Sequence, residues 1–184
     1  LAGRARAVMA TRAGSRREPG VIVKSPRITE LTLDPHMLAE KLKTEGEKVR
    51  ALFASLTEEQ WRTPVYTEAA EWTPRSILAH LVTAERGFLK LFENIRLGGE
   101  GSSPEFSIDR FNARQQEKSS NLTPADLLPL YSAIRAEMVE YVAALSPADL
   151  EVRGRHPALG ISTLESMIKM IYLHNQQHAR DIRA

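Results

Sequence analysis

The chain of 184 residues is long enough for one domain with a substantial core, and its composition, 42% hydrophobic and 26% charged, is ordinary for a globular protein. It contains no cysteine, which excludes a disulfide framework, a thiolate metal ligand and a cysteine nucleophile. This absence also fits a cytoplasmic protein. No apolar run approaches about 18 residues, so neither a membrane-spanning helix nor a membrane partner is expected.

Positive charge is concentrated at the start of the chain. Residues 1–28 carry a net charge of +6, so residues 29–184 carry −4 of the total of +2. Because nucleic-acid-binding domains depend on clustered Lys and Arg, this balance argues against a nucleic-acid partner for the body of the protein. We expect a basic, disordered extension over residues 1–30 and one domain over residues 31–184. The alternative to a solvated tail is contact with phosphate or an anionic membrane surface.

The first predicted helix covers residues 35–56. Asp34 followed by Pro35 combines an N-cap with proline at the first helical position. Apolar residues then recur at spacings of three and four. Residues 57–60 predict a short capped turn, and in the loop that follows we expect Trp61 and Trp72 to pack onto the helices.

The second predicted helix starts with the same signal, Thr73 followed by Pro74, and runs to about residue 97. His80 points toward its apolar face, because it lies three residues after Ile77 and four before Ala84. Two glycines then end the helix. The connection over residues 98–122 is long and polar, which is typical of segments that are functional or cross the end of a bundle. It contains one possible short helical piece around Phe111.

The third predicted helix begins at Thr123 and Pro124, the third use of this start signal, and ends near residue 145. A short turn over residues 146–150 follows. Residues 154–160 are expected to form a loop, and a small β element near Val152 or Val65 is the alternative.

The last predicted helix spans residues 161–182. Its apolar stripe continues into two histidines, His174 and His178, which lie on neighbouring turns of one face. Two neutral imidazoles in this arrangement can bind one divalent metal ion. The alternative is that both are hydrogen-bonded helix residues near the end of a bundle.

Four long amphipathic helices without strand signals predict an all-α protein, a helical bundle. Facing helices of such bundles often build metal sites, so His80 is expected to join His174 and His178 as a third ligand. Three protein ligands leave a coordination position for water or substrate. Nitrogen ligands favour Zn²⁺, Ni²⁺, Fe²⁺ or Cu²⁺ over Ca²⁺ or Mg²⁺.

The residues around this histidine set have alternative interpretations. Asn175, Gln176 and Gln177 either orient a ligand imidazole or form a solvated polar face, and the second is favoured. Glu85 lies roughly 140° around the helix from His80, so an ion pair is expected in place of metal ligation. Tyr172 either contributes a hydroxyl to a pocket or packs in the core.

Three further residues are expected to lie away from the metal. His36 falls in the first turn of the first helix and His156 in a loop beside a proline, so both are expected at the surface. Asn112 is interpreted as a buried loop anchor, with a catalytic role as the weaker alternative.

Residues 71–85, EWTPRSILAHLVTAE, resemble the second helix of the DinB/YfiT-like superfamily, and HNQQH over residues 174–178 resembles its His-x-x-x-His on the fourth helix. The pair Phe111–Asn112 and the lead-in over residues 160–163 also fit, so the resemblance covers about residues 34–183. It implies a four-helix bundle with long crossover connections, often dimeric. It also implies a divalent metal bound by three histidines, at the positions of His80, His174 and His178 identified above.

The resemblance leaves the reaction open, because the family includes transferases that use bacillithiol or mycothiol, a maleylpyruvate isomerase and resistance proteins. We expect a metal-dependent S-transferase or hydrolase that acts on a small electrophile. Zinc or nickel is the expected ion, a low-molecular-weight thiol such as bacillithiol or mycothiol a possible cosubstrate, and a homodimer the expected assembly. The alternative is a non-catalytic, stress-related bundle in which metal only adds stability. Nucleic-acid binding through the basic extension is the weakest hypothesis.

Overall fold

The computed structural model describes residues 34–68 and 71–184, so the extension predicted over residues 1–30 lies outside the described residues. The described part of the chain is mainly helical. Its elements in order are α1 (Pro35–Ala54), α2 (Glu58–Arg62), α3 (Pro74–Arg96), α4 (Ile108–Lys118), α5 (Pro124–Ala143), α6 (Pro147–Glu151), β1 (Arg153–His156), β2 (Gly160–Thr163) and α7 (Leu164–Arg183).

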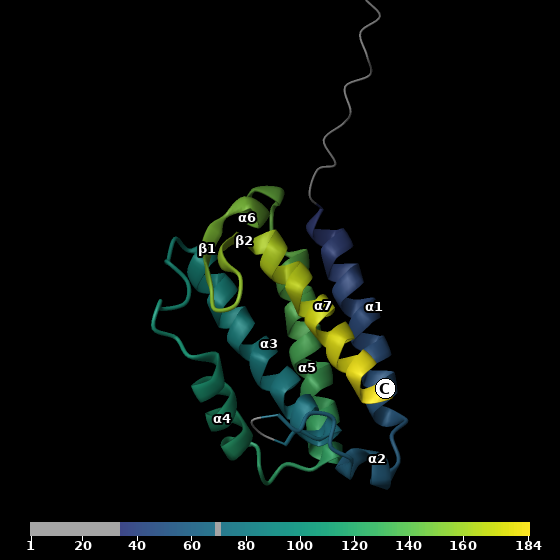
Figure 1. The fold of residues 1–184 in the computed structure, drawn as a ribbon. Helices are drawn as coiled ribbons and strands as arrows, with labels where there is room; N and C mark the ends of the chain where they lie inside the picture. The colour runs from purple at the N-terminus through teal and green to yellow at the C-terminus, as the bar shows by residue number, and fades with distance from the viewer. Residues whose placement is uncertain (1–33, 69–70) are drawn as a thin grey trace, which may run out of the picture. The chain divides into compact units, whose positions relative to one another are not determined.

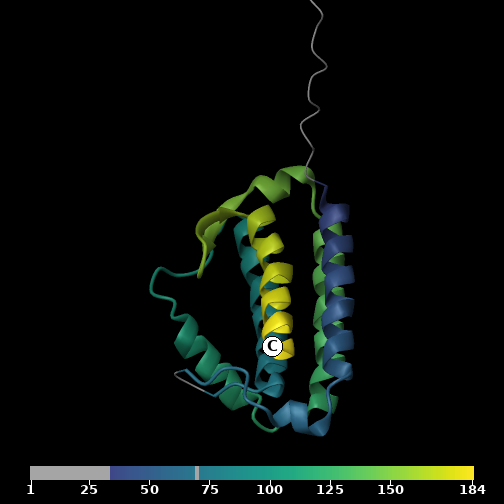
Figure 2. The same ribbon diagram turned by 45° about the vertical axis from the view of Figure 1, so that its right-hand side comes forward.

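The four long helices form a bundle in which α1 and α3 each pack against both α5 and α7. In Figures 1 and 2, α1 and α7 run down the page while α3 and α5 run up it. The long helices α3 and α5, which follow each other within the bundle, are therefore parallel, and the chain between them must cross the length of the bundle. This crossover carries α4 along the outside, packed against α3. The predicted four-helix bundle with a long crossover connection is confirmed.

Helices α1, α3 and α5 begin where the sequence signals place them, whereas α7 begins at Leu164, three residues after its predicted start, because residues 160–163 form β2. The side chains of Asp34, Thr73 and Thr123 accept hydrogen bonds from backbone N–H groups in the first turns of α1, α3 and α5, and a proline follows each cap. Thr163 caps α7 in the same way, without a proline. Each cap satisfies a donor that has no partner within its helix. Residues 108–118 form α4, as the possible helical piece suggested.

The predicted loop over residues 154–160 is instead a β-hairpin, so the alternative of a small β element near Val152 is the correct one. Strands β1 and β2 pair antiparallel, from Arg153 opposite Thr163 to His156 opposite Gly160. Strands of four residues are too short to produce a recognisable alternation of apolar and polar residues. Gly101 also forms a parallel bridge to Arg155, which attaches the start of the crossover to the hairpin.

The core is divided into two apolar clusters by a layer of buried polar side chains. One cluster occupies the end of the bundle near the hairpin and includes Leu42, Phe92, Met138 and Ile168. The other occupies the opposite end and includes Phe53, Leu78 and Leu127. The layer between them, which we call the polar belt, has a member on each long helix: Glu45, Glu85, Tyr131, Arg135 and Asn175.

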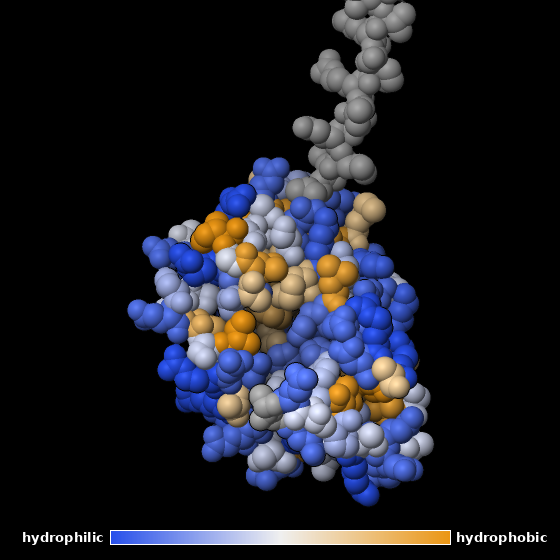
Figure 3. Space-filling model, in the orientation of Figure 1, coloured by the Kyte–Doolittle hydropathy of each residue, from blue (hydrophilic) through white to orange (hydrophobic). Residues whose placement is uncertain are grey.

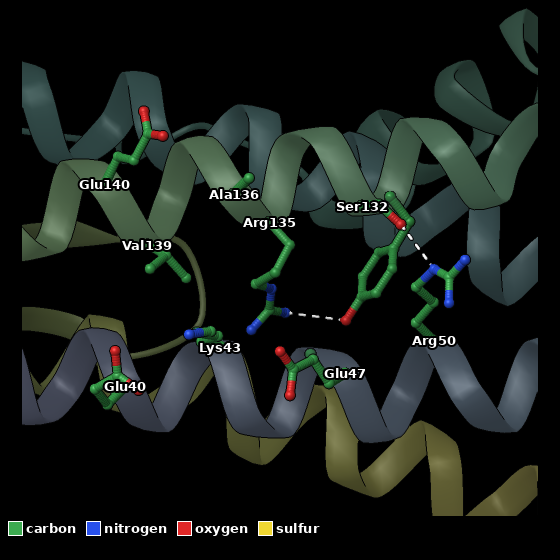
Figure 4. Close-up of a pocket in the computed structure, with 11 residues that line it drawn as sticks. Glu40, Lys43, Glu47, Arg50, Ser132, Arg135, Ala136, Val139 and Glu140 are labelled. Atoms are coloured by element: carbon green, nitrogen blue, oxygen red, sulfur yellow. Dashed lines mark hydrogen bonds between the residues drawn. The ribbon is translucent and has the colours of Figure 1, made fainter.

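Arg135 is the centre of the polar belt. It forms an ion pair with Glu85, and it donates to the Leu42 carbonyl at 3.0 Å and to the Tyr131 hydroxyl at 3.2 Å. Figure 4 shows its side chain extending from α5 toward α1. A Cβ atom at Gly46 would lie 2.8 Å from the Arg135 side chain, so glycine is required at this approach. The adjoining groove between α1 and α5, about 420 Å³, is lined by charges of both signs and by none of the three predicted ligands.

Candidate metal centre

The structure brings the three predicted ligands together. His80 on α3 and His174 on α7 place their Nε2 atoms 3.2 Å apart, and the Nε2 atoms of His174 and His178 are 2.9 Å apart. One ring nitrogen from each of the three lies within 4.8 Å of the other two, and no other group of His, Cys, Asp or Glu in the described part of the chain meets this criterion. The i, i+4 spacing accounts for the pair on α7, and the antiparallel contact with α3 supplies the third ring.

These nitrogens fit a divalent ion. Zinc–nitrogen bonds of about 2.0–2.1 Å at tetrahedral angles separate the ligand nitrogens by about 3.3–3.4 Å. The separations of 3.2 Å and 2.9 Å are close to that value. A neutral imidazole has one N–H, so His174 Nε2 cannot donate a hydrogen bond to both His80 and His178. One cation, by contrast, would be attracted to the Nε2 lone pairs of all three rings. The donor set therefore suits a nitrogen-preferring ion such as zinc or nickel.

A hydrogen-bonded chain of side chains orients His178. The Tyr66 hydroxyl donates to Asp181 at 2.5 Å and lies 2.9 Å from His178 Nδ1. Since the hydroxyl hydrogen is directed to the carboxylate, the tyrosine oxygen accepts from Nδ1–H. His178 is thereby held as the tautomer whose Nε2 lone pair faces the other two histidines. Burial, together with the Asp181 carboxylate, raises the pKa of Tyr66 and keeps this hydroxyl protonated.

A Tyr66→Phe variant tests this role. It should bind zinc about 10-fold or more weakly, because removing an outer partner of a ligand histidine typically costs 10–100-fold in metal affinity. Competition with a chromogenic chelator measures the change. Tyr172→Phe is the matched control, because Tyr172 packs against the apolar cluster near the hairpin and should leave the affinity unchanged. Equal affinities for both variants and the wild type would contradict the assigned role of Tyr66.

Burial keeps the three imidazoles neutral. It lowers the pKa of both His80 and His178 to about 3, and the neighbouring histidine charges act in the same direction. The pKa of His174 is also lowered by burial. The Trp72 ring packs edge-on against His80, with the ring centroids 5.2 Å apart. Neutral imidazole is the form that binds metal, so the site is prepared for an ion at neutral pH.

The polar belt supports the centre from the bundle interior. Asn175, between the two α7 ligands, donates to Glu85 at 3.0 Å and to the Tyr131 hydroxyl at 3.2 Å. Asn175 is therefore buried, which corrects the favoured expectation of a solvated face, while Gln177 is exposed as expected and Gln176 donates to Glu45 at 2.8 Å. Glu85 forms an ion pair with Arg135 on a neighbouring helix, so the expectation of an ion pair is confirmed.

A largely apolar cavity of about 420 Å³ opens beside the histidines, and His80 and His174 form part of its wall. The other walls come from α4, the start of the crossover and the hairpin. Figure 3 shows apolar residues gathered around a hollow beside the hairpin on this face. The apolar side chains lining the cavity include Phe88, Leu91, Phe106, Ile108, Phe111 and Met170.

The remaining predicted residues have mixed outcomes. His156 was expected in solvent but is only 3% exposed, because the hairpin folds it against the Phe88 ring. Asn112 is half-buried on α4 and lines the cavity, so it is not a buried loop anchor. Tyr172 packs in the core, and His36 is exposed as expected.

Sequence reasoning did not identify Tyr66 or Asp181. Asp181 follows His178 by three residues, a spacing that places both on one face of α7 and that could have indicated a partner. Tyr66 lies in a loop far from α7 in sequence, and no local signal connects it to the histidines.

Comparison of the sequence with known protein families identifies the family of this chain. A family model for the DinB superfamily matches residues 41–182, which include all three histidines and Tyr66. The chain belongs to the DinB superfamily. No curated protein matches the chain in sequence.

Several solved structures share the fold. YfiT from Bacillus subtilis, described as a probable metal-dependent hydrolase with an unusual four-helix bundle topology, superposes with a TM-score of 0.69 at 18% identity, over 86% of this chain and 89% of YfiT. A mycothiol-dependent maleylpyruvate isomerase gives a TM-score of 0.68 at 15% identity, over 83% of this chain and 62% of that protein. The colibactin self-resistance protein ClbS, solved with double-stranded DNA, gives a TM-score of 0.63 at 12% identity, over 81% of this chain and 95% of ClbS. At these identities the likeness establishes the fold alone. In the described part of the DinB-like chain, no helix is both long and apolar enough to cross a membrane.

Proposed function

We propose that this DinB-superfamily protein is a divalent-metal-dependent enzyme acting on a small electrophile, with His80, His174 and His178 as ligands. The observation that carries the proposal is the convergence of three neutral imidazoles, two of which, His80 and His174, line a cavity large enough for a small molecule. An ion held by three protein ligands acts as a Lewis acid with a position open to water, a thiol or the substrate. The two reactions supported are hydrolysis and S-transfer.

The protein's own groups have separate tasks in either reaction. Tyr66 and Asp181 hold the His178 tautomer, and Asn175 ties the ligand helix to the polar belt. The apolar walls of the cavity limit the water around a bound electrophile, which strengthens polar interactions there. Asn112 lies beside His80 and lines the same cavity, so it is placed to orient a substrate or nucleophile.

Two model reactions test the proposal. In the hydrolytic test, water adds to the acyl carbon of p-nitrophenyl acetate and p-nitrophenolate leaves. In the transfer test, the sulfur of bacillithiol, mycothiol or glutathione replaces chloride on 1-chloro-2,4-dinitrobenzene. We expect at least one reaction to be faster with the zinc- or nickel-loaded protein than with a His174→Ala/His178→Ala variant. If the loaded protein is silent in both but markedly more stable than its metal-free form, the structural role for the metal is favoured.

The histidine pKa values predict how stability depends on pH. The unfolded chain protonates its histidines near pH 6.5, whereas the folded protein keeps His80 and His178 neutral down to about pH 3. The unfolded state therefore binds more protons over this interval, and the free energy of unfolding of the metal-free protein should fall as the pH falls below 6.5. Urea denaturation at pH 7.0, 6.0 and 5.0 measures the effect. A His80→Gln variant should show a shallower slope, and an identical slope would contradict the prediction.

A further inference from the structure

The β-hairpin contributes a third histidine to the cavity, beside His80 and His174, and this histidine is not one of the three converging ligands. His156 lies at the end of β1, is 3% exposed and lines the cavity together with His80 and His174. Its ring stacks on Phe88, with the ring centroids 5.4 Å apart and an angle of 29° between the rings. It is not among the three histidines whose nitrogens converge.

The hairpin determines the tautomer of His156. Its Nδ1 atom accepts hydrogen bonds from the backbone N–H groups of Ala158 at 3.1 Å and Leu159 at 3.2 Å. An atom that accepts two hydrogen bonds carries no hydrogen, so the ring hydrogen must be on Nε2. Burial lowers the pKa of His156 to about 4, so the ring is neutral near pH 7 and has this single N–H to donate.

The Nε2–H of His156 is buried and has no hydrogen-bond partner. Buried donors are nearly always paired, because an unpaired donor has lost its water and gained nothing in return. The hairpin hydrogen bonds and the stacked Phe88 ring prevent the imidazole from turning to find a partner elsewhere. An acceptor from a molecule in the adjoining cavity would satisfy it.

The cavity walls restrict which molecule this is. The walls are mainly aromatic and aliphatic, and they include no Asp, Glu or Arg side chain; Lys90 is the one fully charged residue among them. A cation would lose its hydration there without a carboxylate to compensate for the loss. A neutral molecule or one with a single negative charge, with a flat apolar body, fits these walls.

We infer that the cavity binds a mainly apolar, preferably aromatic molecule carrying a carbonyl-type oxygen, and that His156 Nε2–H donates to this oxygen. The inference deepens the proposed function. It rests on that function only in identifying the bound molecule as the electrophile that the metal centre acts on. His156 is then a substrate-binding residue, and the hairpin is the element that selects the substrate.

The experiment uses a pair of probes that differ only in the acceptor. One is 6-fluoro-2-acetonaphthone, and the other is 6-fluoro-2-ethylnaphthalene, in which a CH₂ group replaces the carbonyl. The dissociation constants are measured by ¹⁹F NMR with both zinc-loaded and metal-free full-length protein. We expect the ketone to bind about 3- to 10-fold more tightly than the ethyl compound to the metal-free protein, the contribution of one net hydrogen bond.

Three variants isolate the donor. In His156→Asn, the side-chain oxygen can replace Nδ1 as the hairpin acceptor while the Nε2–H is lost, so the ketone preference should disappear and the ethyl compound should bind as before. His156→Phe keeps a ring against Phe88 and should give the same loss of preference, so the result does not depend on one variant folding. Gly87→Leu adds a side chain beside Phe111, which a Cβ at this position already approaches to 3.8 Å. It should weaken both neutral probes more than about 10-fold by filling the cavity.

The outcomes separate this inference from the proposed function. A ketone preference that survives both His156 variants, or affinities unaffected by Gly87→Leu, would overturn the inference even if the protein binds zinc. A preference that depends on His156 in metal-free protein, in a chain that never binds zinc, would sustain the inference and remove the enzyme proposal.

Discussion

A His174→Ala/His178→Ala variant should lose the metal site, with zinc affinity falling by more than about 100-fold, because the loss of ligands exceeds the 10–100-fold typical of outer groups. Only His80 of the three converging imidazoles would remain. The measurement is a competition titration with a chromogenic chelator. The matched control is His36→Ala, which removes an exposed histidine and should bind zinc like the wild type.

The same variant separates a lost site from a lost fold. Because neither imidazole belongs to the two apolar clusters of the core, their removal should leave the thermal stability of the metal-free protein nearly unchanged. Zinc at 100 times its dissociation constant should stabilise the wild type by about 2.7 kcal/mol, roughly 5–10 °C in Tm for a domain of this size. The same zinc concentration should stabilise the variant by less than about 0.4 kcal/mol, roughly 1 °C in Tm. An equal zinc-induced shift in both proteins would place the metal elsewhere.

A Glu85→Leu variant should lose about 3–5 kcal/mol of unfolding free energy, because it leaves the buried Arg135 guanidinium without its counter-charge. The two side chains are 1% and 6% exposed, so solvent cannot compensate. Urea denaturation measures the loss. Zinc affinity should fall as well, because Glu85 also accepts from Asn175, which sits between two ligands.

Two comparisons show whether the lost charge partner is responsible. Glu85→Leu/Arg135→Leu removes both charges and should recover much of the stability lost by the single variant, since a buried ion pair is often replaceable by apolar packing. Glu58→Ala breaks the pair with Arg62, whose side chains are 86% and 79% exposed, and should cost less than about 1 kcal/mol. A Glu85→Leu variant no less stable than Glu58→Ala would contradict the importance of the polar belt.

The helices and the metal ligands were predictable because their signals are local. The Asp34–Pro35, Thr73–Pro74 and Thr123–Pro124 caps act within one turn of each helix, so sequence neighbours suffice to place them. Helical periodicity put His174 and His178 on one face in the same way. The partnership with His80 required only that α3 and α7 be neighbours in a bundle.

The parts that were not predicted depend on contacts between distant residues. Tyr66 reaches His178 across 112 positions of the sequence, and Arg135 meets Glu85 across 50. His156 is buried because a short hairpin folds over Phe88, whereas a histidine beside a proline is locally a surface residue. Asn175 was assigned to a polar face because its sequence neighbours are polar. In the structure it is buried, and it donates a hydrogen bond to Glu85, the carboxylate of the buried ion pair.

The most direct test of the metal centre is the anomalous diffraction of zinc-loaded crystals, recorded on both sides of the zinc absorption edge. The geometry predicts one strong peak per chain, about 2.0–2.1 Å from the Nε2 atoms of His80, His174 and His178. The coordination position that the three histidines leave open should face the cavity beside the hairpin. The absence of a peak between the three rings, in protein that is folded and was saturated with zinc, would contradict the account.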